Sequence, residues 1–317
     1  MTPSAQHRDP PELALVVVAG SRPLRLRWLL NALEDQAGAP GRLEVIVVCP
    51  AGRRDPLATD HPLVAEGAAR VLEVPASSST VARNLGWRAA RAPLVGFADE
   101  DTRPPRDWVK RALDDAARTP DAVIAGGLVP DPFEDSGFLA LVHESRRTRP
   151  GDPLAPLAGS VWPRWLLEAL DGLEEAAPDE TAAAADLVAR AREHGARIVP
   201  AAGLVLYDSV RSLGPGTPAG AFTAGGGLAW AVRRHPSLRA ELALGVFRRP
   251  SHAALAAAVF AASLAPRRVA VAAVAFPLVV ATASGLPPRR VLGRGLREGA
   301  EMAALAAGSA RHRTLVL

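Results

Sequence analysis

The feature that most constrains the fold is a series of five short apolar runs, each separated from the next by a segment with helical spacing. The runs cover residues 12–19, 43–48, 69–74, 93–98 and 122–129. Short continuous apolar runs are typical of strands buried on both faces of a parallel sheet. Strands that alternate with helices predict an α/β fold with a mostly parallel sheet flanked by helices. We expect helices at residues 24–33, around Arg83 and Asn84, and at 105–117, 138–147, 164–170 and 181–194, with a last strand pair at 197–207.

The fourth apolar run leads directly into three carboxylates, Asp99, Glu100 and Asp101. In open α/β sheets, ligands bind at the edge formed by the carboxyl ends of the strands. Carboxylate oxygens suit Mg²⁺ or Mn²⁺, which proteins commonly hold together with a substrate phosphate. Taken alone, however, an acidic triplet is equally compatible with a solvated turn that caps the next helix.

Three elements around this turn resemble, in their order and spacing, those of the family-2 glycosyltransferases. They are Ala82-Arg83-Asn84 in a helix, the strand that ends in the acidic triplet, and Pro104-Pro105 followed by Asp107-Trp108 at a helix start. Segments at 171–175, 186–190, 195–198 and 205–208 continue the resemblance in the same order. The resemblance implies a GT-A (Rossmann-like) domain that takes a nucleotide-diphospho-sugar as donor.

The resemblance also implies the residues of the site. Asp99 and Asp101 would hold Mg²⁺ or Mn²⁺, and Asp208 stands where the family often has a metal-binding His. The residues expected to contact the nucleotide are Ser21, Arg22, Cys49, Arg83, Asn84, Asp99 and Arg211. Two alternatives stay open, since Arg83 can be a charge on a helix surface and Asp208 can simply begin a loop.

The nucleotide pocket departs from the family pattern in two places. The turn after the first run reads VAGSR at 18–22, where the family usually has P-T-x-N-R. Cys49 follows the second run where the family usually has an Asp. Because a thiol does not accept hydrogen bonds as a carboxylate does, we expect an unusual nucleotide preference or binding through the backbone.

The catalytic base is a larger departure. The family's acidic motif aligns on Asp186-Leu187, which places Ala183 and Ala184 where the acidic pair belongs. The nearest acids are Asp179 and Glu180, which we take as candidates for the base that deprotonates the acceptor. As residues at a helix start they are also ordinary capping groups.

Composition narrows the partners and the compartment. The single cysteine, Cys49, excludes an internal disulfide and fits a reducing compartment. The arginines are spread among acids without a basic stripe interleaved with aromatic residues, so we expect no nucleic acid as partner. Residues 1–11 are polar and Pro-rich, which predicts a disordered N-terminus and no signal peptide. The glycosyltransferase domain, expected at 12–212, should therefore lie on the cytoplasmic side.

The C-terminal third changes character after a linker and amphipathic helix expected at 213–250. Residues 251–265 are apolar and flanked by arginine pairs, and 269–286 form an 18-residue stretch without charge. A helix of about 20 residues is needed to cross a bilayer upright. Since arginines beside apolar helices can reach phosphate headgroups, we expect 251–317 to form a membrane-associated helical hairpin and an interfacial helix. A hairpin buried against the catalytic domain is the alternative.

Two functions from different classes fit these residues. The first is a metal-dependent, inverting glycosyltransferase at the cell membrane, with membrane lipids as partners and a lipid-linked or cell-envelope glycan as acceptor. The second is a catalytically degenerate GT-A protein that acts as a binding or scaffold subunit at the membrane. The alanines at 183 and 184 favour the second, whereas an intact acidic triplet favours the first. A nucleotidyltransferase is disfavoured because the chain has no G-x-x-x-x-G-K-[ST] loop.

Overall fold

The computed structural model describes most of the chain, in two compact units. The described residues are 10–20, 22–37, 39, 41–51, 60–75, 78–133, 152, 154, 157–209, 226–264 and 288–317. Unit 1 comprises residues 1–132, 146–175 and 190–209. Unit 2 comprises residues 133–145, 176–189 and 210–317.

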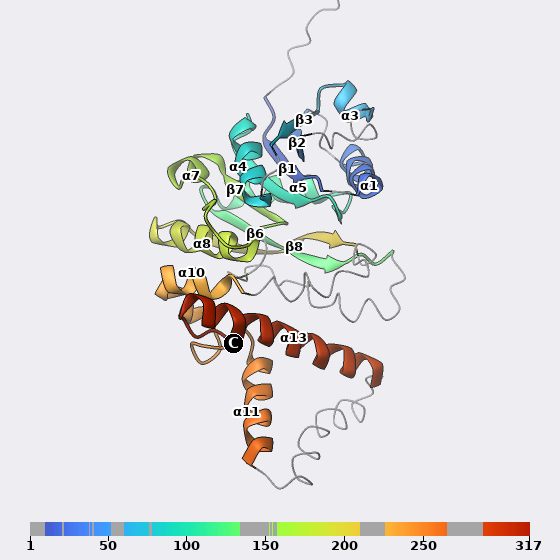
Figure 1. Ribbon diagram of the computed structural model, residues 1–317. Coiled ribbons are helices and arrows are strands. Elements are labelled where there is room, and N and C mark those ends of the chain that lie inside the picture. The colour runs from blue at the N-terminus through green and yellow to red at the C-terminus, as the bar shows by residue number, and fades with distance from the viewer. Residues whose placement is uncertain are drawn as a thin grey trace, which may run out of the picture. The chain divides into compact units, whose positions relative to one another are not determined.

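Unit 1 is built on a mixed, mostly parallel sheet (Figure 1). In the described part of the chain this sheet has eight strands in the order β3-β2-β1-β4-β7-β6-β8-β5. The strands are β1 Leu13–Val18, β2 Leu43–Pro50, β3 Ala69–Val74, β4 Leu94–Asp99, β5 Thr102–Arg103, β6 Val123–Pro130, β7 Ser160–Pro163 and β8 Ile198–Asp208. Strands β1 to β4 run parallel, as do β6 and β8, whereas β7 is antiparallel to β4 and β6, and β5 is antiparallel to β8. The predicted fold class is thus confirmed for the sheet.

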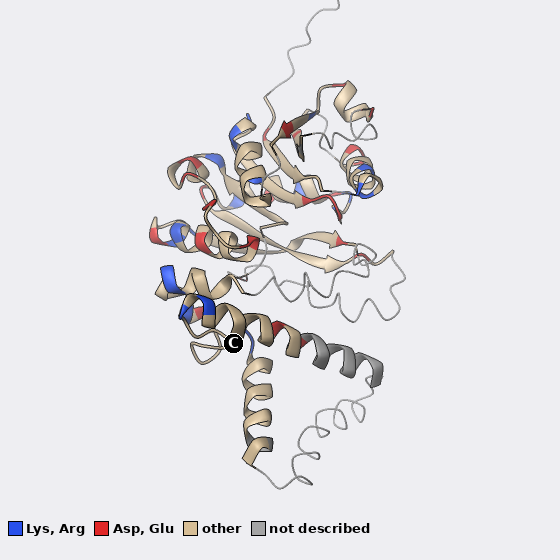
Figure 2. Ribbon diagram, in the orientation of Figure 1, with Lys and Arg blue, Asp and Glu red and all other residues tan. Residues whose placement is uncertain are grey.

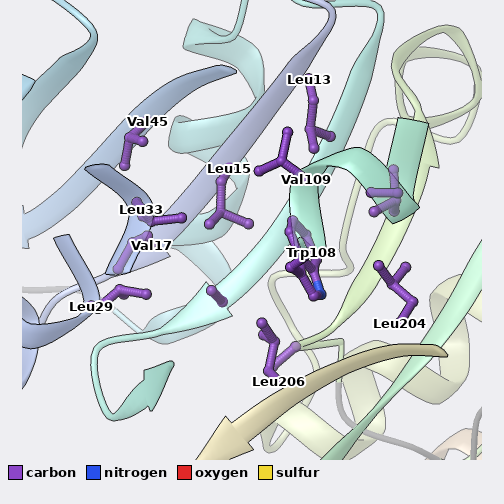
Figure 3. Packing of buried hydrophobic residues seen from close by; sticks show 14 of the residues in the cluster. Leu13, Leu15, Val17, Leu29, Leu33, Val45, Trp108, Val109, Leu204 and Leu206 are labelled. Carbon is purple, nitrogen blue, oxygen red and sulfur yellow. The ribbon is translucent and has the colours of Figure 1, made fainter. Parts of the chain in front are cut away.

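Helices cover both faces of this sheet. In unit 1 they are α1 Pro23–Glu34, α3 Pro62–Ala65, α4 Ser79–Ala89, α5 Trp108–Arg118 and α7 Arg164–Ala169. On one face, Leu15 and Val17 of β1 join Leu29 of α1 and Trp108 of α5 in a single buried cluster (Figure 3). On the other face α4 lies so close that a Cβ on Gly86 would stand 2.4 Å from a methyl of Val16. Alternate residues of one strand therefore pack against helices on opposite faces of the sheet. Because both faces are buried, the strand is apolar along its whole length.

One strand prediction needs correction, and two strands were missed. The expected strand pair at 197–207 is wrong, because β8 is one strand that follows β6 along its length, with an irregularity between Ala125 and Gly127. The glycine between them allows this course, since a Cβ on Gly126 would stand 2.1 Å from the carbonyl oxygen of Gly159. The strands β5 and β7 were not predicted. The helix expected at 138–147 lies outside the described residues.

Unit 2 is helical where it is described. Its elements are α10 Leu228–Arg234, the 3₁₀ helix η2 Pro236–Glu241, α11 Pro250–Leu264 and α13 Pro288–His312, with residues 180–189 of α8 Glu180–Glu193. The fully buried Asp186 accepts a hydrogen bond from Nε2 of His235 at 2.9 Å and forms an ion pair with Nε of Arg234 at 3.2 Å. The middle of α8 is thereby fixed to the end of α10, since a buried carboxylate requires such partners.

A second carboxylate, the partly buried Glu301 of α13, fixes the start of α11. Its oxygens lie 3.3 Å from Arg248, 3.6 Å from Arg249 and 3.7 Å from Nε2 of His252, and these four residues form the Glu301 cluster. Burial by itself raises the pKa of Glu301, but the contacts with His252 and the two arginines outweigh it and lower the pKa to about 2. The cluster therefore stabilises unit 2 most when Glu301 is ionised.

The expected membrane hairpin is described only in part. Residues 250–264 form α11 and residues 288–312 form α13, whereas the uncharged stretch 269–286 lies outside the described residues. None of the helices in the described ranges combines the length and the apolar character needed to cross a bilayer.

Candidate active site

Three predicted acidic residues come from segments that meet at the carboxyl edge of the sheet in unit 1. Asp99 ends β4 beside Val18, the last residue of β1. Thr102 then pairs with Asp208 at the end of β8, and the N–H of Ser209 donates to the carbonyl of Asp101 at 3.0 Å. The carboxyl ends of β4 and β8 are thus joined through the short strand β5. This is the edge at which open α/β sheets bind ligands.

Two arginines from different elements pair with this acidic turn. The guanidinium of Arg83, from α4, lies 2.5 Å from Oδ1 of Asp99, and Nη1 of Arg22, just before α1, lies 3.1 Å from Oδ2 of Asp101. Only 1% of the Arg83 side chain is exposed, so the alternative of a charge on a helix surface is wrong. A buried guanidinium needs such a carboxylate partner. The side chain of Arg22 is 41% exposed and can therefore meet a ligand from solvent.

Glu100, the middle acid, faces the turn after β1. Its Oε2 accepts a hydrogen bond from the N–H of Gly20 at 2.6 Å and lies 3.5 Å from the N of Arg22. A Cβ on Gly20 would stand 2.8 Å from Oε1 of Glu100. The three acids thus divide into two that pair with arginines and one that binds backbone amides.

A further ion pair, which the sequence reasoning missed, borders Asp208. Arg103 of β5 donates twice to Asp131, at 2.9 and 2.8 Å, and its guanidinium lies 5.0 Å from the ring centre of Tyr207. The N–H of Asp131 in turn donates to the carbonyl of Asp208 at 3.0 Å. Asp131 follows directly after β6, so the rule that found Asp99 at a strand end could have found it too.

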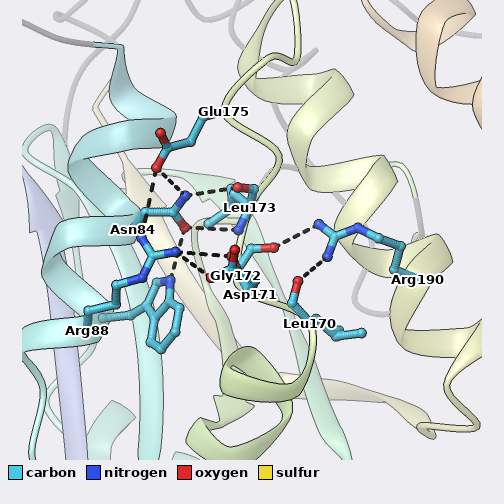
Figure 4. Close-up of polar contacts among 9 residues, drawn as sticks. Asn84, Arg88, Leu170, Asp171, Gly172, Leu173, Glu175 and Arg190 are labelled. Atoms are coloured by element: carbon cyan, nitrogen blue, oxygen red, sulfur yellow. Dashed lines mark hydrogen bonds and ion pairs between the residues drawn. The ribbon is translucent and has the colours of Figure 1, made fainter.

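Asn84 lies at the centre of a buried network (Figure 4). Its Nδ2 donates to the carbonyl of Leu173 and to Oε1 of Glu175, both at 2.9 Å. Its Oδ1 accepts from the N–H of Leu173 at 2.9 Å and from Nε1 of Trp87 at 3.0 Å. An amide offers two donor and two acceptor positions, and all four are used here. The amide of Asn84 is thus fully engaged within the scaffold, and its contact with the nucleotide stays a prediction.

The same loop is held from its other side. Arg190 donates to the carbonyls of Leu170 at 2.6 Å and Gly172 at 2.7 Å, and Arg88 donates to Oδ1 of Asp171 at 2.8 Å (Figure 4). Gly172 has a φ of +70°, and a Cβ there would stand 2.5 Å from Oδ1 of Asn84. The segment 171–175, which resembles a family motif, is therefore fastened between α4 and the end of α8.

Three further residues were predicted to contact the nucleotide, namely Cys49, Ser21 and Arg211. Cys49 is 3% exposed, belongs to the hydrophobic core, and its thiol donates to the carbonyl of Leu72 at 3.6 Å. Its side chain therefore packs inside the sheet layer. Ser21 and Arg211 lie outside the described residues.

The base candidates lie at the start of α8, in unit 2. The two carboxylate oxygens of Asp179 accept from the N–H groups of Ala182 and Gly227, each at 2.8 Å, and Glu180 is the first residue of the helix. Burial raises the pKa of Asp179, and these backbone hydrogen bonds only partly offset it. Ala183 and Ala184 are almost fully buried. Asp179 therefore caps the helix in the way that its position allows.

A divalent metal fits the edge in unit 1 by the chemistry of its ligands. Within the described ranges, no three His, Cys, Asp or Glu side chains gather into a complete metal cage. Mg²⁺ and Mn²⁺ do not require one, because they are commonly held by one or two carboxylates together with waters and substrate phosphates. Asp99 and Asp101 supply such hard oxygen ligands, with Asp208 beside them on the paired strand.

An open α/β sheet with paired carboxylates and arginines at its carboxyl edge is suited to a nucleotide-dependent transferase. Residues 15–153 match the family model described as Glycosyl transferase family 2. The chain thus carries a domain of this family, and we class it among the glycosyltransferases. A comparison with curated proteins gives no significant match in sequence.

Solved structures share the fold over nearly the whole chain. The mannosyltransferase PcManGT from Pyrobaculum calidifontis, in complex with GDP-Man and Mn²⁺, superposes with a TM-score of 0.67 at 22% identity, covering 95% of this chain and 87% of that one. TarS 1–349 of S. aureus, in complex with UDP-GlcNAc, gives a TM-score of 0.51 at 15% identity, covering 96% and 92%. At these identities the likeness shows the fold alone, and it confirms the predicted GT-A-like architecture.

Proposed function

We propose that the chain transfers a sugar from a nucleotide-diphosphate donor to a lipid-linked or cell-envelope acceptor, in a metal-dependent and inverting reaction. The observation that carries the proposal is the acidic turn at the carboxyl edge of the sheet, with Arg22 and Arg83 paired to Asp101 and Asp99. Sugar transfer releases a nucleoside diphosphate, so the site must stabilise negative charge on a departing phosphate. Carboxylates that bind a cation, beside an exposed guanidinium, meet this need.

Each side chain has a distinct role in this proposal. Asp99 and Asp101 would hold Mg²⁺ or Mn²⁺, which when bound neutralises charge on the departing diphosphate. Arg83 orients Asp99, while the exposed guanidinium of Arg22 would contact a phosphate oxygen. The acceptor hydroxyl loses its proton as its oxygen bonds to the sugar carbon and the bond to phosphate breaks. The proton passes to a general base, for which Asp179 and Glu180 stay the candidates expected from the sequence.

The comparisons support the donor class. PcManGT is described with GDP-Man and Mn²⁺, and TarS with UDP and with UDP-GlcNAc. By analogy we propose a nucleotide-diphospho-sugar donor and a divalent metal for this chain. The low identities leave the base and the sugar to be measured.

The surface of α11 supports a membrane location. The helix carries no charged residue from Ser251 to Leu264, and Figure 2 shows it in tan along this length. Phe260 is 67% exposed and Leu264 73% exposed. An apolar helix of 15 residues is about 22 Å long, which is shorter than the hydrocarbon core of a bilayer. We therefore propose that α11 inserts into the interface at the cytoplasmic face of the cell membrane, where a lipid-linked acceptor is at hand.

Calorimetric titration with UDP, GDP and dTDP, with and without Mn²⁺, tests the donor site. We expect Mn²⁺-dependent binding of one nucleotide that is lost in Asp101→Ala. Asp114→Ala is the matched control, because Asp114 is an acid on α5 whose side chain is 46% exposed and pairs with a surface cation, Lys110, in a hydrogen bond of 2.7 Å. If the folded chain binds none of the three nucleotides, the proposed transferase function is refuted. That result would support the alternative of a catalytically degenerate scaffold, which Ala183 and Ala184 favour.

A further inference from the structure

We propose that Glu100 is a positioning residue for donor binding, which fastens the turn after β1 to the acidic turn after β4 and so holds Arg22 beside Asp101. This inference rests on the proposed function and adds a residue for which that function has so far no role. It also bears on how the turn at 18–22, which departs from the family pattern, can meet a diphosphate.

The contacts of Glu100 are directed to the backbone of one turn. The residue is 9% exposed, and its Oε2 accepts from the N–H of Gly20 at 2.6 Å while lying 3.5 Å from the N of Arg22. Hydrogen bonds from backbone N–H groups to an ionised carboxylate are among the stronger ones in proteins. A buried carboxylate without such donors would be unfavourable, so the backbone of the turn stabilises Glu100 and Glu100 in turn fixes the backbone.

The fit on the turn side is tight. A Cβ on Gly20 would stand 2.8 Å from Oε1 of Glu100, so any other residue at this position would displace the carboxylate. The turn continues into α1 at Pro23, and Arg22 is the residue that precedes the helix. Glu100 therefore fixes the backbone from which the Arg22 side chain extends.

The side chain of Arg22 returns to the acidic turn one residue further on. Its Nη1 lies 3.1 Å from Oδ2 of Asp101, the neighbour of Glu100. Two adjacent acids thus hold two ends of the same turn, one through the backbone and one through the guanidinium. Because Glu100 occupies the amide of Gly20, this amide is not offered to a diphosphate, whereas the guanidinium of Arg22 lies at the acidic turn where a diphosphate would bind.

Glu44 provides a matched control in the same unit. It is 3% exposed, and its Oε1 accepts from the N–H groups of Arg91 at 2.6 Å and Ala92 at 2.8 Å. It is the second residue of β2, and its partners precede β4, so it lies at the amino ends of these parallel strands. Glu44 and Glu100 therefore both accept from backbone N–H groups, at opposite edges of one sheet, and Glu44 in addition pairs with Arg70 at 3.2 Å and Arg91 at 3.3 Å.

The test is a double-mutant cycle on nucleotide affinity. Titration with Mn²⁺ and the diphosphate that binds the unmodified chain would be run on Glu100→Ala, Arg22→Ala and the double variant. We expect each single change to weaken binding about tenfold, the loss that follows from one contact to a charged group. Because Glu100 acts through Arg22, the double variant should be no weaker than the weaker single one. Glu100→Gln keeps an acceptor oxygen and should recover most of the affinity.

Glu44→Ala separates positioning from simple stability. We expect it to lower the melting temperature as Glu100→Ala does while leaving nucleotide affinity unchanged. If Glu100→Ala melts early but binds as tightly as Glu44→Ala, or if its loss adds to that of Arg22→Ala, the inference is overturned. If the unmodified chain binds none of UDP, GDP and dTDP, the proposed function itself fails and the inference fails with it.

Discussion

Replacing Asn84 with Ala tests whether this residue belongs to the scaffold or to the nucleotide site. Its amide joins α4 to the segment 171–175 through four hydrogen bonds, all between 2.9 and 3.0 Å. Only 1% of the residue is exposed. We expect the substitution to loosen this segment and to leave nucleotide affinity within about threefold of the unmodified chain, a loss too small for a lost hydrogen bond to a charged phosphate.

The magnitude follows from the groups left without a partner. The N–H and carbonyl of Leu173 and Nε1 of Trp87 belong to buried residues, whereas Glu175 is exposed and can be hydrated. An unsatisfied buried group destabilises by about 1–3 kcal/mol, so three of them set an upper range near 9 kcal/mol. Water entering beside Glu175 can replace part of the lost hydrogen bonding, and we therefore expect a loss of about 3 kcal/mol.

Hydrogen exchange of the Leu173 amide is the direct assay, because a global melt of a chain with two units does not give a single free energy. A loss of about 3 kcal/mol lowers protection of this amide about 100-fold. Asn31→Ala is the control, since Asn31 is exposed and its side chain has one hydrogen bond among the described residues, with His61 at 2.9 Å. Unchanged protection at Leu173 would refute the reasoning. If Asn84→Ala weakened nucleotide binding as much as Asp101→Ala, Asn84 would instead be a residue that contacts the nucleotide.

Two further predictions concern unit 2. Phe260→Glu should weaken co-sedimentation with vesicles of anionic phospholipid, whereas Leu244→Glu, at a site 83% exposed outside α11, should not; equal binding by both variants would refute the membrane role of α11. Glu301→Gln should lower the melting temperature by several degrees at pH 7. Because the folded pKa of Glu301 is about 2 and its ordinary value is 4.5, the stabilisation is complete above pH 4.5 and is lost as the pH falls toward 2. The two melting curves should therefore converge on acidification, and a difference that is the same at pH 7 and pH 3 would contradict this.

The long parallel strands could be predicted because burial on both faces forces a continuous apolar run. The bounds of β3 agree with the run at 69–74, and β1 and β4 agree to within a residue at each end. The strands β5 and β7 have two and four residues, which is too short for any periodicity. Their places in the sheet depend on pairing with distant strands, and β7 follows Gly159, whose φ of +88° only the folded chain reveals.

Those parts of the site that lie at the ends of predicted strands could be predicted from the sequence. Asp99 and Asp101 were found because an apolar strand stops at them. The sequence does not indicate toward which backbone a carboxylate points, so the contact of Glu100 with Gly20 needed the structure. The nucleotide contact expected of Asn84 came from resemblance alone, and its hydrogen bonds lie within the scaffold.

The charge balance at the carboxyl edge of the sheet makes binding of the donor depend on binding of the metal. The described side chains placed there comprise five carboxylates and three guanidiniums, a formal excess of two negative charges; they are Asp99, Glu100, Asp101, Asp131, Asp208, Arg22, Arg83 and Arg103. One divalent cation offsets this excess. A nucleoside diphosphate brings further negative charge, which carboxylates would repel without the cation. Since Arg22 already pairs with Asp101, a cation at Asp101 would also release this guanidinium toward the phosphates. We therefore expect donor affinity to depend on the metal more steeply in the unmodified chain than in Arg22→Ala.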